Sequence, residues 1–169
     1  MELSEQEKNE LEDLYQSLLN DEKVKRMLDI PMHRGSNCYI HSFMVAKTAI
    51  HRALKKKNVN LKILLYAAVF HDYYLYDWRT DRSKKKGHGK NHPGIAIENA
   101  KKDFDLPEES EAIIRSHMWP INFKLFPKTK EARLLTLADK RIATREFFIS
   151  KKKKLKNRSK LLEYISKLF

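Results

Sequence analysis

The chain has 169 residues and a formal net charge of +13, with 41% hydrophobic and 34% charged residues but only four glycines and five prolines. This length suits one domain with a sizeable core, and the mixture favours helices over a turn-rich β architecture. The single cysteine excludes an intramolecular disulfide, and no apolar run approaches the roughly 18 residues that a membrane span needs.

The first residues, MELSEQEKNELEDL, are acidic and lack the basic-then-apolar order of an export signal, so we expect a cytoplasmic protein. The positive charge is uneven, because residues 151–169 contain eight Lys or Arg and one Glu. A basic surface attracts nucleotides, nucleic acid and anionic lipid alike. The positive charge therefore predicts a negatively charged partner but does not identify that partner.

Hydrophobic spacing predicts helices in the first part of the chain. The first helix begins at the capping box of residues 4–7, and leucines and Tyr15 then repeat along one face. After the polar stretch MHRGSN, a second helix begins at about His41, which lies on the buried stripe. The lysines of residues 55–57 favour its C-terminal end.

The most apolar run, residues 61–70, is predicted to be the central helix of a bundle. After Lys62 it has no polar face, so other helices must surround it. His71 and Asp72 stand side by side at its far end. An imidazole and a carboxylate are rarely buried without partners, so this pair indicates a partner such as a metal ion.

A basic loop at residues 79–94, RTDRSKKKGHGKNHPG, separates this helix from the next. Pro93 suits the first turn of a helix that runs to about Phe104, so we expect His92 at the start of that helix.

Two further helices complete the predicted core. In the helix after Pro107, His117 shares a face with the isoleucines three and four residues earlier and points inward. In the helix at residues 129–148, Asp139 lies on an apolar stripe. The basic segment KKKKLKNRSK follows, and a short amphipathic helix, LLEYISKLF, is expected to end the chain.

Six inward-facing polar residues are thus spread over five helices or helix ends. Each one alone is more often a hydrogen-bonded core residue than a ligand. Together they incur a desolvation cost that one or two metal ions could offset. Imidazole and carboxylate without thiolate suit a divalent transition metal such as Fe, Mn, Co, Ni or Zn. The six candidate metal ligands are His41, His71, Asp72, His92, His117 and Asp139.

The order of these residues resembles the HD-domain superfamily of metal-dependent phosphohydrolases. Its pattern of His, then His-Asp, then a distant Asp matches His41, His71 with Asp72, and Asp139, over roughly residues 32–148. The stretches HDYYLYDW, NHPGIAIENA, HMWP and LADK together resemble a group of uncharacterised bacterial HD-domain proteins.

The resemblance implies an all-α, HD-domain-like helical bundle. It also implies cleavage of a phosphoester or phosphoanhydride of a nucleotide or small phosphorylated metabolite by metal-activated water, with His71 and Asp72 as the catalytic pair. By the same resemblance, one ion is bound by the four matching residues, and Asp72 bridges to a second ion held by His92 and His117.

Two departures bear on the substrate. HD hydrolases of guanosine tetraphosphate alarmones carry an adjacent Glu-Asp shortly after the His-Asp pair, where this chain has Leu75 and Tyr76. Cyclic dinucleotide phosphodiesterases carry a Gly-Tyr-Pro signature, whereas MWP follows His117 here. Neither reaction is therefore expected.

The basic loop supplies the predicted substrate-binding residues, Arg79, His88 and Lys90. Cationic groups there could hold phosphate oxygens while the metal ions polarise the phosphorus. A solvated loop explains any single lysine about as well. Trp78 and Trp119 could stack a nucleotide base, although core packing is the commoner role of such residues.

We expect an N-terminal helical extension at residues 1–31, an HD-type metal-binding domain at 32–150 and a basic tail with a short amphipathic helix at 151–169. The tail also favours a different class of function, a non-enzymatic basic helical protein that binds nucleic acid or a nucleotide. That alternative explains the charge but not the buried histidines and aspartates.

A third interpretation is a degenerate HD fold that senses a nucleotide. The expected partners are thus a small phosphorylated substrate, in the first place a nucleotide, and nucleic acid through the tail.

Overall fold

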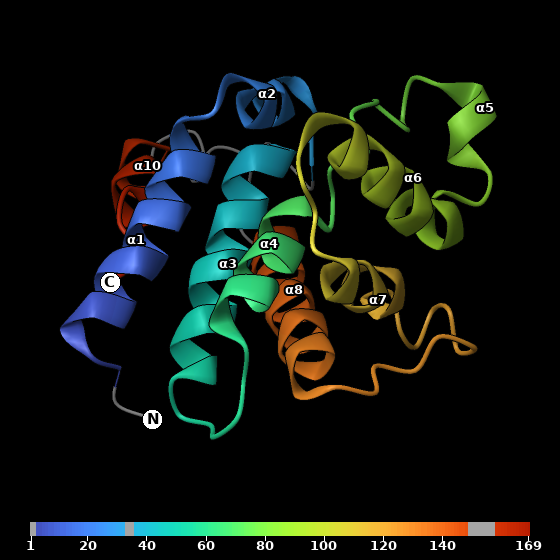
Figure 1. Cartoon of the computed structure of the whole chain (residues 1–169). Helices are drawn as coiled ribbons and strands as arrows, with labels where there is room; N and C mark the ends of the chain where they lie inside the picture. The colour runs from blue at the N-terminus through green and yellow to red at the C-terminus, as the bar shows by residue number, and fades with distance from the viewer. Residues whose placement is uncertain (1–2, 33–35, 149–157) are drawn as a thin grey trace.

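The computed structural model describes residues 3–32, 36–148 and 158–169, and these form an all-α bundle (Figure 1). Within these ranges there is no strand, and one isolated antiparallel bridge joins Pro31 to Asn37. The predicted fold class is therefore confirmed. None of the described helices is long and apolar enough to cross a membrane.

The helices follow one another along the chain from Glu5 to Ile165. They are α1 (Glu5–Asn20), α2 (Glu22–Lys25), the 3-10 helix η1 (Arg26–Asp29), α3 (Cys38–Ala53), α4 (Leu61–Phe70), α5 (Arg82–Lys85), α6 (His88–Asp103), α7 (Glu108–Ser116), α8 (Lys130–Phe148) and α10 (Arg158–Ile165). The helix α1 begins at the predicted capping box, because the Ser4 hydroxyl accepts from the Glu7 N–H while the Glu7 carboxylate accepts from the Ser4 N–H.

The central position of α4 is confirmed. This helix packs against α1, α3, α6, α7 and α8, and its apolar side chains are buried on almost every side (Figure 1). Each fully buried leucine or phenylalanine side chain contributes roughly 1.5–3 kcal/mol relative to exposure. This burial holds the C-terminal end of α4 inside the bundle, so His71, the residue that caps the helix, has no exposed surface.

The helix α6 begins earlier than predicted. Its first residue is His88, after Gly87 in the left-handed conformation with φ of 84°. Pro93 therefore lies in the second turn, and His92 lies inside the helix and not at its start. The proline has no N–H, so α6 lacks the one intrahelical hydrogen bond that this position would make to the carbonyl of Gly89.

The helix α3 also begins earlier than predicted, at Cys38 instead of about His41. The side chain of Asn37 accepts a hydrogen bond from the N–H of Ile40 at 2.9 Å, which caps the helix. His41 is consequently the fourth residue of a regular helix and not its first.

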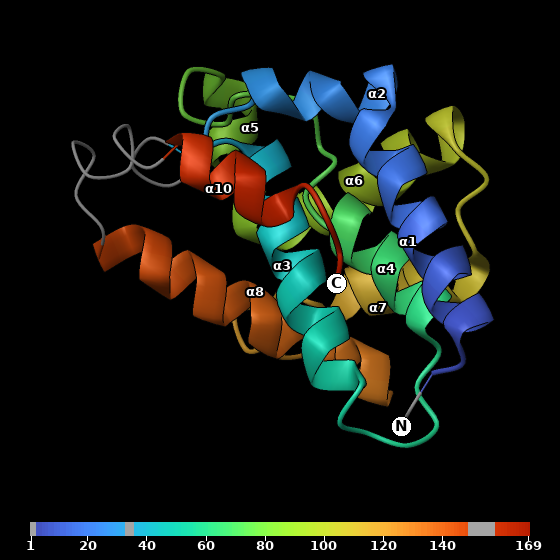
Figure 2. The same cartoon turned by 90° about the vertical axis from the view of Figure 1, so that its left-hand side faces the viewer.

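The end of the chain packs onto the bundle. The helix α10 contacts α3 and lies beside it (Figure 2), and Ile165 and Leu168 are 1% and 0% exposed. The Tyr15 hydroxyl donates to the carbonyl of Ile165 at 2.7 Å, and the Lys47 ammonium donates to the carbonyls of Tyr164 and Lys167. The segment 158–169 is therefore tied to the same core as α1 and α3.

A helix is present near the end of the chain, as predicted, but it ends at Ile165 and does not continue to residue 169. The run of lysines at residues 151–157 lies outside the described residues, as does the expected boundary at residue 150. The division into three segments stays a prediction.

Candidate metal centre

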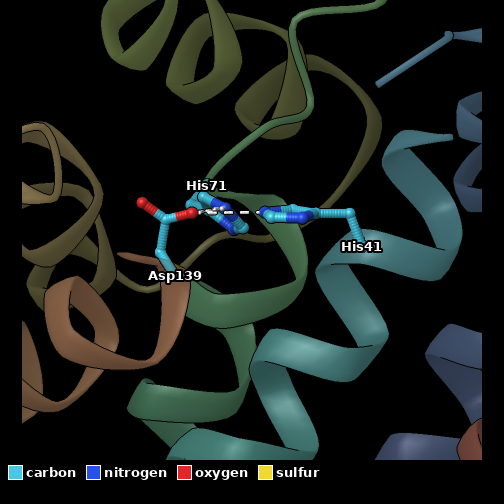
Figure 3. A group of neighbouring side chains, drawn as sticks. All are labelled: His41, His71 and Asp139. Carbon is cyan, nitrogen blue, oxygen red and sulfur yellow. Dashed lines mark hydrogen bonds and ion pairs between the residues drawn. The ribbon is translucent and has the colours of Figure 1, made fainter. Parts of the chain in front are cut away.

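The six candidate metal ligands lie together inside the bundle. They come from α3, the C-terminal ends of α4 and α7, the second turn of α6 and the middle of α8. All six are buried, the most exposed being Asp139 at 9%. Figure 3 shows His41, His71 and Asp139 pointing toward one another from three helices, with an ion pair between His41 and Asp139.

Three of the histidines are fixed by carbonyl oxygens of their own helices. The Nδ1 atoms of His71 and His117 lie 2.9 and 2.7 Å from the carbonyl oxygen three residues earlier, and Nδ1 of His92 lies 2.9 Å from the carbonyl oxygen four residues earlier. A carbonyl oxygen can only accept, so each Nδ1 carries the hydrogen and donates it. The remaining nitrogen, Nε2, then presents a lone pair to the centre of the cluster.

The fourth histidine is fixed by a carboxylate. Nδ1 of His41 lies 3.0 Å from a carboxylate oxygen of Glu146, which is itself 5% exposed. Burial by itself lowers the pKa of His41, but the charges of Glu146 and Asp139 outweigh it and leave that pKa well above its usual value. A carboxylate that receives the outer hydrogen of a histidine is the usual second partner of a metal-binding imidazole.

Sequence reasoning missed Glu146. The residue lies seven positions after Asp139, which is two helical turns, and therefore shares its buried stripe with Asp139 and Ile142. A carboxylate repeated at this spacing on an apolar stripe was the available signal.

The Nε2 atoms face the two aspartates. His41 Nε2 lies 3.2 Å from Asp139 Oδ1, and His71 Nε2 lies 3.3 Å from Asp72 Oδ2. The other carboxylate oxygen, Asp72 Oδ1, lies 3.2 Å from His92 Nε2 and 4.0 Å from His117 Nε2. His41 Nε2 also lies 3.8 Å from Asp72 Oδ2. The two oxygens of Asp72 therefore face different pairs of histidines, and this carboxylate lies between two halves of the cluster.

Several Nε2 atoms in the cluster have no hydrogen-bond donor facing them. His71 Nε2 is buried and has no hydrogen-bond partner among the residues that the structure describes. The Nε2 atoms of His92 and His117 lie only 3.0 Å apart, and each ring already directs its Nδ1 hydrogen to a backbone carbonyl. Burial, and then the charges of His92 and His71, lower the pKa of His117 to about 3, so this ring stays neutral.

The two aspartates are the negatively charged members of the cluster. Burial alone favours their neutral form, but the neighbouring histidines hold the pKa values of Asp72 and Asp139 below their usual range. Two overlapping groups have ligand atoms within 4.8 Å of one another, and either could hold a metal ion. They are His41 with His71 and Asp139, and His71 with Asp72 and His117. Buried lone pairs beside ionised carboxylates fit a divalent cation.

The predicted substrate-binding residues lie outside this cluster. The Arg79 side chain pairs with Asp77 at 3.2 Å and also donates to the carbonyl of Met32, and Lys90 is exposed on α6. The ring of His88 stacks between Trp78 and His92, with centroids 5.1 and 4.7 Å away. His88 therefore forms a layer directly outside the histidines of the cluster.

The two tryptophans pack against other rings. Trp78 stacks on His88, and Trp119 meets the ring of Phe126 edge to face at a centroid distance of 5.4 Å. Both contacts agree with a packing role.

Lys140, the residue after Asp139 in the chain, lies at the edge of the cluster. Its ammonium donates to the carbonyl oxygen of His117 at 3.2 Å, and the side chain is partly buried. Burial lowers the pKa of Lys140, although the charge of Asp139 opposes this. Since an ammonium has three hydrogens, two remain after this bond.

Comparison with known proteins identifies the family. A family model of the HD domain matches residues 38–144, a range that covers more than half of the chain and contains all six clustered residues. The chain therefore belongs to the HD-domain family, whose members are generally metal-dependent hydrolases. Searches of curated proteins and of solved structures gave no match.

Proposed function

We propose that this protein is a metal-dependent phosphohydrolase that cleaves a phosphoester or phosphoanhydride of a nucleotide or small phosphorylated metabolite with water. One observation carries the proposal. Four imidazoles donate their Nδ1 hydrogens outward and aim their Nε2 atoms at two ionised carboxylates, and one of these nitrogens, in His71, is buried without a hydrogen bond. Membership of the HD-domain family supports the same reaction class.

We further propose that the cluster holds two ions. In one half, His41 and His71 face Asp72 Oδ2, and both also face Asp139. In the other half, His92 and His117 face Asp72 Oδ1. Asp72 would then bridge the ions. The donor types suit Fe, Mn, Co, Ni or Zn.

A divalent ion bound here would polarise a phosphoryl group and bring the pKa of water from about 15.7 to near 7. The protein supplies the rest of the chemistry. The four fixed rings and the two carboxylates would hold the cation in one place, so these side chains would not need to reorient when negative charge develops on the phosphoryl oxygens. Lys140 can donate its remaining hydrogens to a phosphate oxygen at the edge of the cluster. His88, Arg79 and Lys90 stay candidates for binding the rest of the substrate.

The test is a substrate screen with purified protein reconstituted separately with each of the five metals. Phosphomonoesters, cyclic nucleotides and dinucleoside polyphosphates form the panel. We expect metal-dependent hydrolysis of at least one class, and oxygen-18 from water should appear in the phosphoryl product because attack occurs at phosphorus. Asp72→Ala should abolish turnover, whereas Asp105→Ala, which removes an exposed aspartate, should not.

Two outcomes count against the proposal. One is the absence of hydrolysis in fully metal-loaded protein across the panel. The other is turnover that survives complete removal of metal by a chelator.

A further inference from the structure

A cavity of about 900 Å³ lies between α3, α8 and α10, and none of the described residues that line it belongs to the candidate metal centre. Figure 2 shows these three helices side by side on one face of the molecule. Arg52 of α3, Lys55 just after α3, and Arg141 and Arg145 of α8 line the cavity, together with Tyr164 of α10. We name this site the basic groove.

The ionised residues that line the basic groove are all positively charged. Four of its lining residues are Arg or Lys, and no Asp or Glu lines it. Across the described ranges of the chain, these four side chains take part in no ion pair, whereas Arg26 and Arg79 elsewhere each pair with an aspartate. The four cations are therefore available to a negatively charged ligand.

The spacing of these basic residues along the chain places like charges close together. Arg141 and Arg145 are four residues apart on α8, so they share a helical face on which like charges repel. Arg52 lies in the last turn of α3, and Lys55 follows two residues after the end of that helix. An anion bound in the groove would relieve that repulsion. Because successive helical residues are turned by roughly 100°, Arg141 and Arg145 leave α8 on a different side from Asp139.

The shape of the groove favours a chain-like ligand. Lys55, Arg141, Thr144, Arg145 and Tyr164 are all exposed, although they line the cavity. A bound molecule would thus keep much of its surface in water, whereas sites for small ligands bury most of the ligand. An open basic channel suits a polyanion that passes along it, and arginine forks match phosphate groups with two hydrogen bonds.

Tyr164 supplies the second element of such a site. The residue is 46% exposed, and the Lys47 ammonium lies 4.5 Å from the centroid of its ring. Exposed aromatic rings beside a basic channel are what single-stranded nucleic acids use to stack their bases.

We infer that the basic groove binds the backbone phosphates of a single-stranded nucleic acid, with Tyr164 stacking on a base. The inference is independent of the hydrolase proposal, since the two sites share no residue.

The test measures binding of fluorescent mixed-sequence oligonucleotides to the full-length protein by anisotropy over a series of salt concentrations. Single-stranded DNA and RNA form two arms. The groove variant is Arg141→Ala with Arg145→Ala, and the matched control is Lys102→Ala with Lys128→Ala, which removes two exposed positive charges elsewhere. The basic run at residues 151–157 is kept in every variant, so its lysines contribute equally to each measurement.

We expect the groove variant to bind about tenfold more weakly at low salt, and the slope of log affinity against log salt to fall by about 1.4, which corresponds to two lost contacts with a single strand. Tyr164→Leu should weaken binding roughly tenfold with an unchanged slope, because stacking releases no counterions. The control should bind like the unaltered protein. Equal affinities for DNA and RNA would show that the protein contacts only phosphates and bases. Tighter binding of RNA would show that it also contacts the 2′-hydroxyl.

Three results would overturn the inference. One is unaltered affinity and slope in the groove variant. The second is an equal loss in the control, which would reduce the effect to net charge. The third is binding of inorganic tripolyphosphate that depends on Arg141 and Arg145 while the oligonucleotides do not bind.

Discussion

The Nε2 atoms of His92 and His117 lie 3.0 Å apart, and the Nδ1 hydrogen of each ring is already donated to a backbone carbonyl. Two Nε2 lone pairs at this separation repel each other unless a proton or a metal cation lies between or beside them. The contact therefore joins two residues from α6 and α7 into one half of the candidate metal centre, opposite the half built by His41, His71 and Asp139.

The first prediction concerns metal stoichiometry. His92→Ala or His117→Ala should remove about one equivalent of divalent metal and leave the other largely bound, because each variant leaves the opposite half of the cluster intact. Elemental analysis of protein purified without chelator gives the measurement. His88→Ala is the control, since this ring lies one layer outside the cluster. A single equivalent in the unaltered protein that both variants retain would contradict the two-ion arrangement.

The second prediction concerns Glu146. Glu146→Ala should weaken metal binding by roughly 10- to 100-fold, because His41 loses the carboxylate that fixes its ring. Glu146→Gln should weaken metal binding less, since the amide oxygen of the glutamine still accepts the Nδ1 hydrogen of His41. Competition titration with a chromogenic chelator measures both affinities. Equal losses in the two variants would show that charge, and not ring orientation, is what Glu146 supplies.

The histidines and aspartates of the candidate site could be predicted from sequence because helical spacing determines which residues face the core. His41 and Asp139 lie on apolar stripes, and His71 and Asp72 follow a helix that has no polar face. Glu146 was not predicted, since a glutamate near the end of a basic helix is by default exposed. Its burial depends on the packing of α8 against α3.

Other features depended on contacts that local patterns do not encode. The early start of α6 follows from the conformation of Gly87, whereas the sequence rule placed Pro93 in the first turn. The bond between Lys140 and the His117 carbonyl depends on how α7 meets α8. The docking of the C-terminal segment rests on partners such as Tyr15 and Ile165, which are 150 positions apart in the chain.

The third prediction is a difference in pH dependence between metal-free and metal-loaded protein. Burial lowers the pKa of His71, but Asp72 and Asp139 outweigh it and raise that pKa from 6.5 to about 9. A raised pKa stabilises the fold fully below the unfolded value, and this stabilisation is lost as the pH rises through the folded value. The melting temperature of metal-free protein should therefore fall between pH 6.5 and about 9.

Metal should reverse this trend. The ion must displace the protons of its ligands, so its binding, and the stability that it adds, should increase with pH over the same range. Differential scanning calorimetry of both forms measures the two trends. A metal-free protein whose melting temperature stays level or rises across this range would be at odds with the expected protonation of the cluster.

The fourth prediction concerns the C-terminal segment. Ile165→Ala or Leu168→Ala should lower the free energy of unfolding by about 2–5 kcal/mol, because each side chain is buried against the bundle. Leu162→Ala, at a leucine of α10 that is 39% exposed, is the matched control and should cost much less. Urea unfolding followed by circular dichroism gives the values. Equal, small losses at all three positions would mean that the segment is not part of the cooperative core in solution.

This docking also changes how the basic run should be tested. A truncation before residue 158 removes the buried side chains of Ile165 and Leu168 together with the lysines. The role of charge is therefore tested by substituting the lysines at residues 151–154, with the packed segment retained.

The last prediction concerns Lys140. Its ammonium donates to the carbonyl of His117 at 3.2 Å and keeps two hydrogens for a phosphate oxygen. Lys140→Met keeps most of the apolar length of the side chain and removes the charge, so it should raise the KM of the substrate found in the screen by roughly tenfold or more while metal content stays unchanged. Lys140→Arg should restore part of the effect, since it returns a cation. Lys102→Met, at an exposed lysine of α6, should change neither quantity. Loss of metal in Lys140→Met would instead show that Lys140 positions His117. An unchanged KM would show that Lys140 does not bind the substrate.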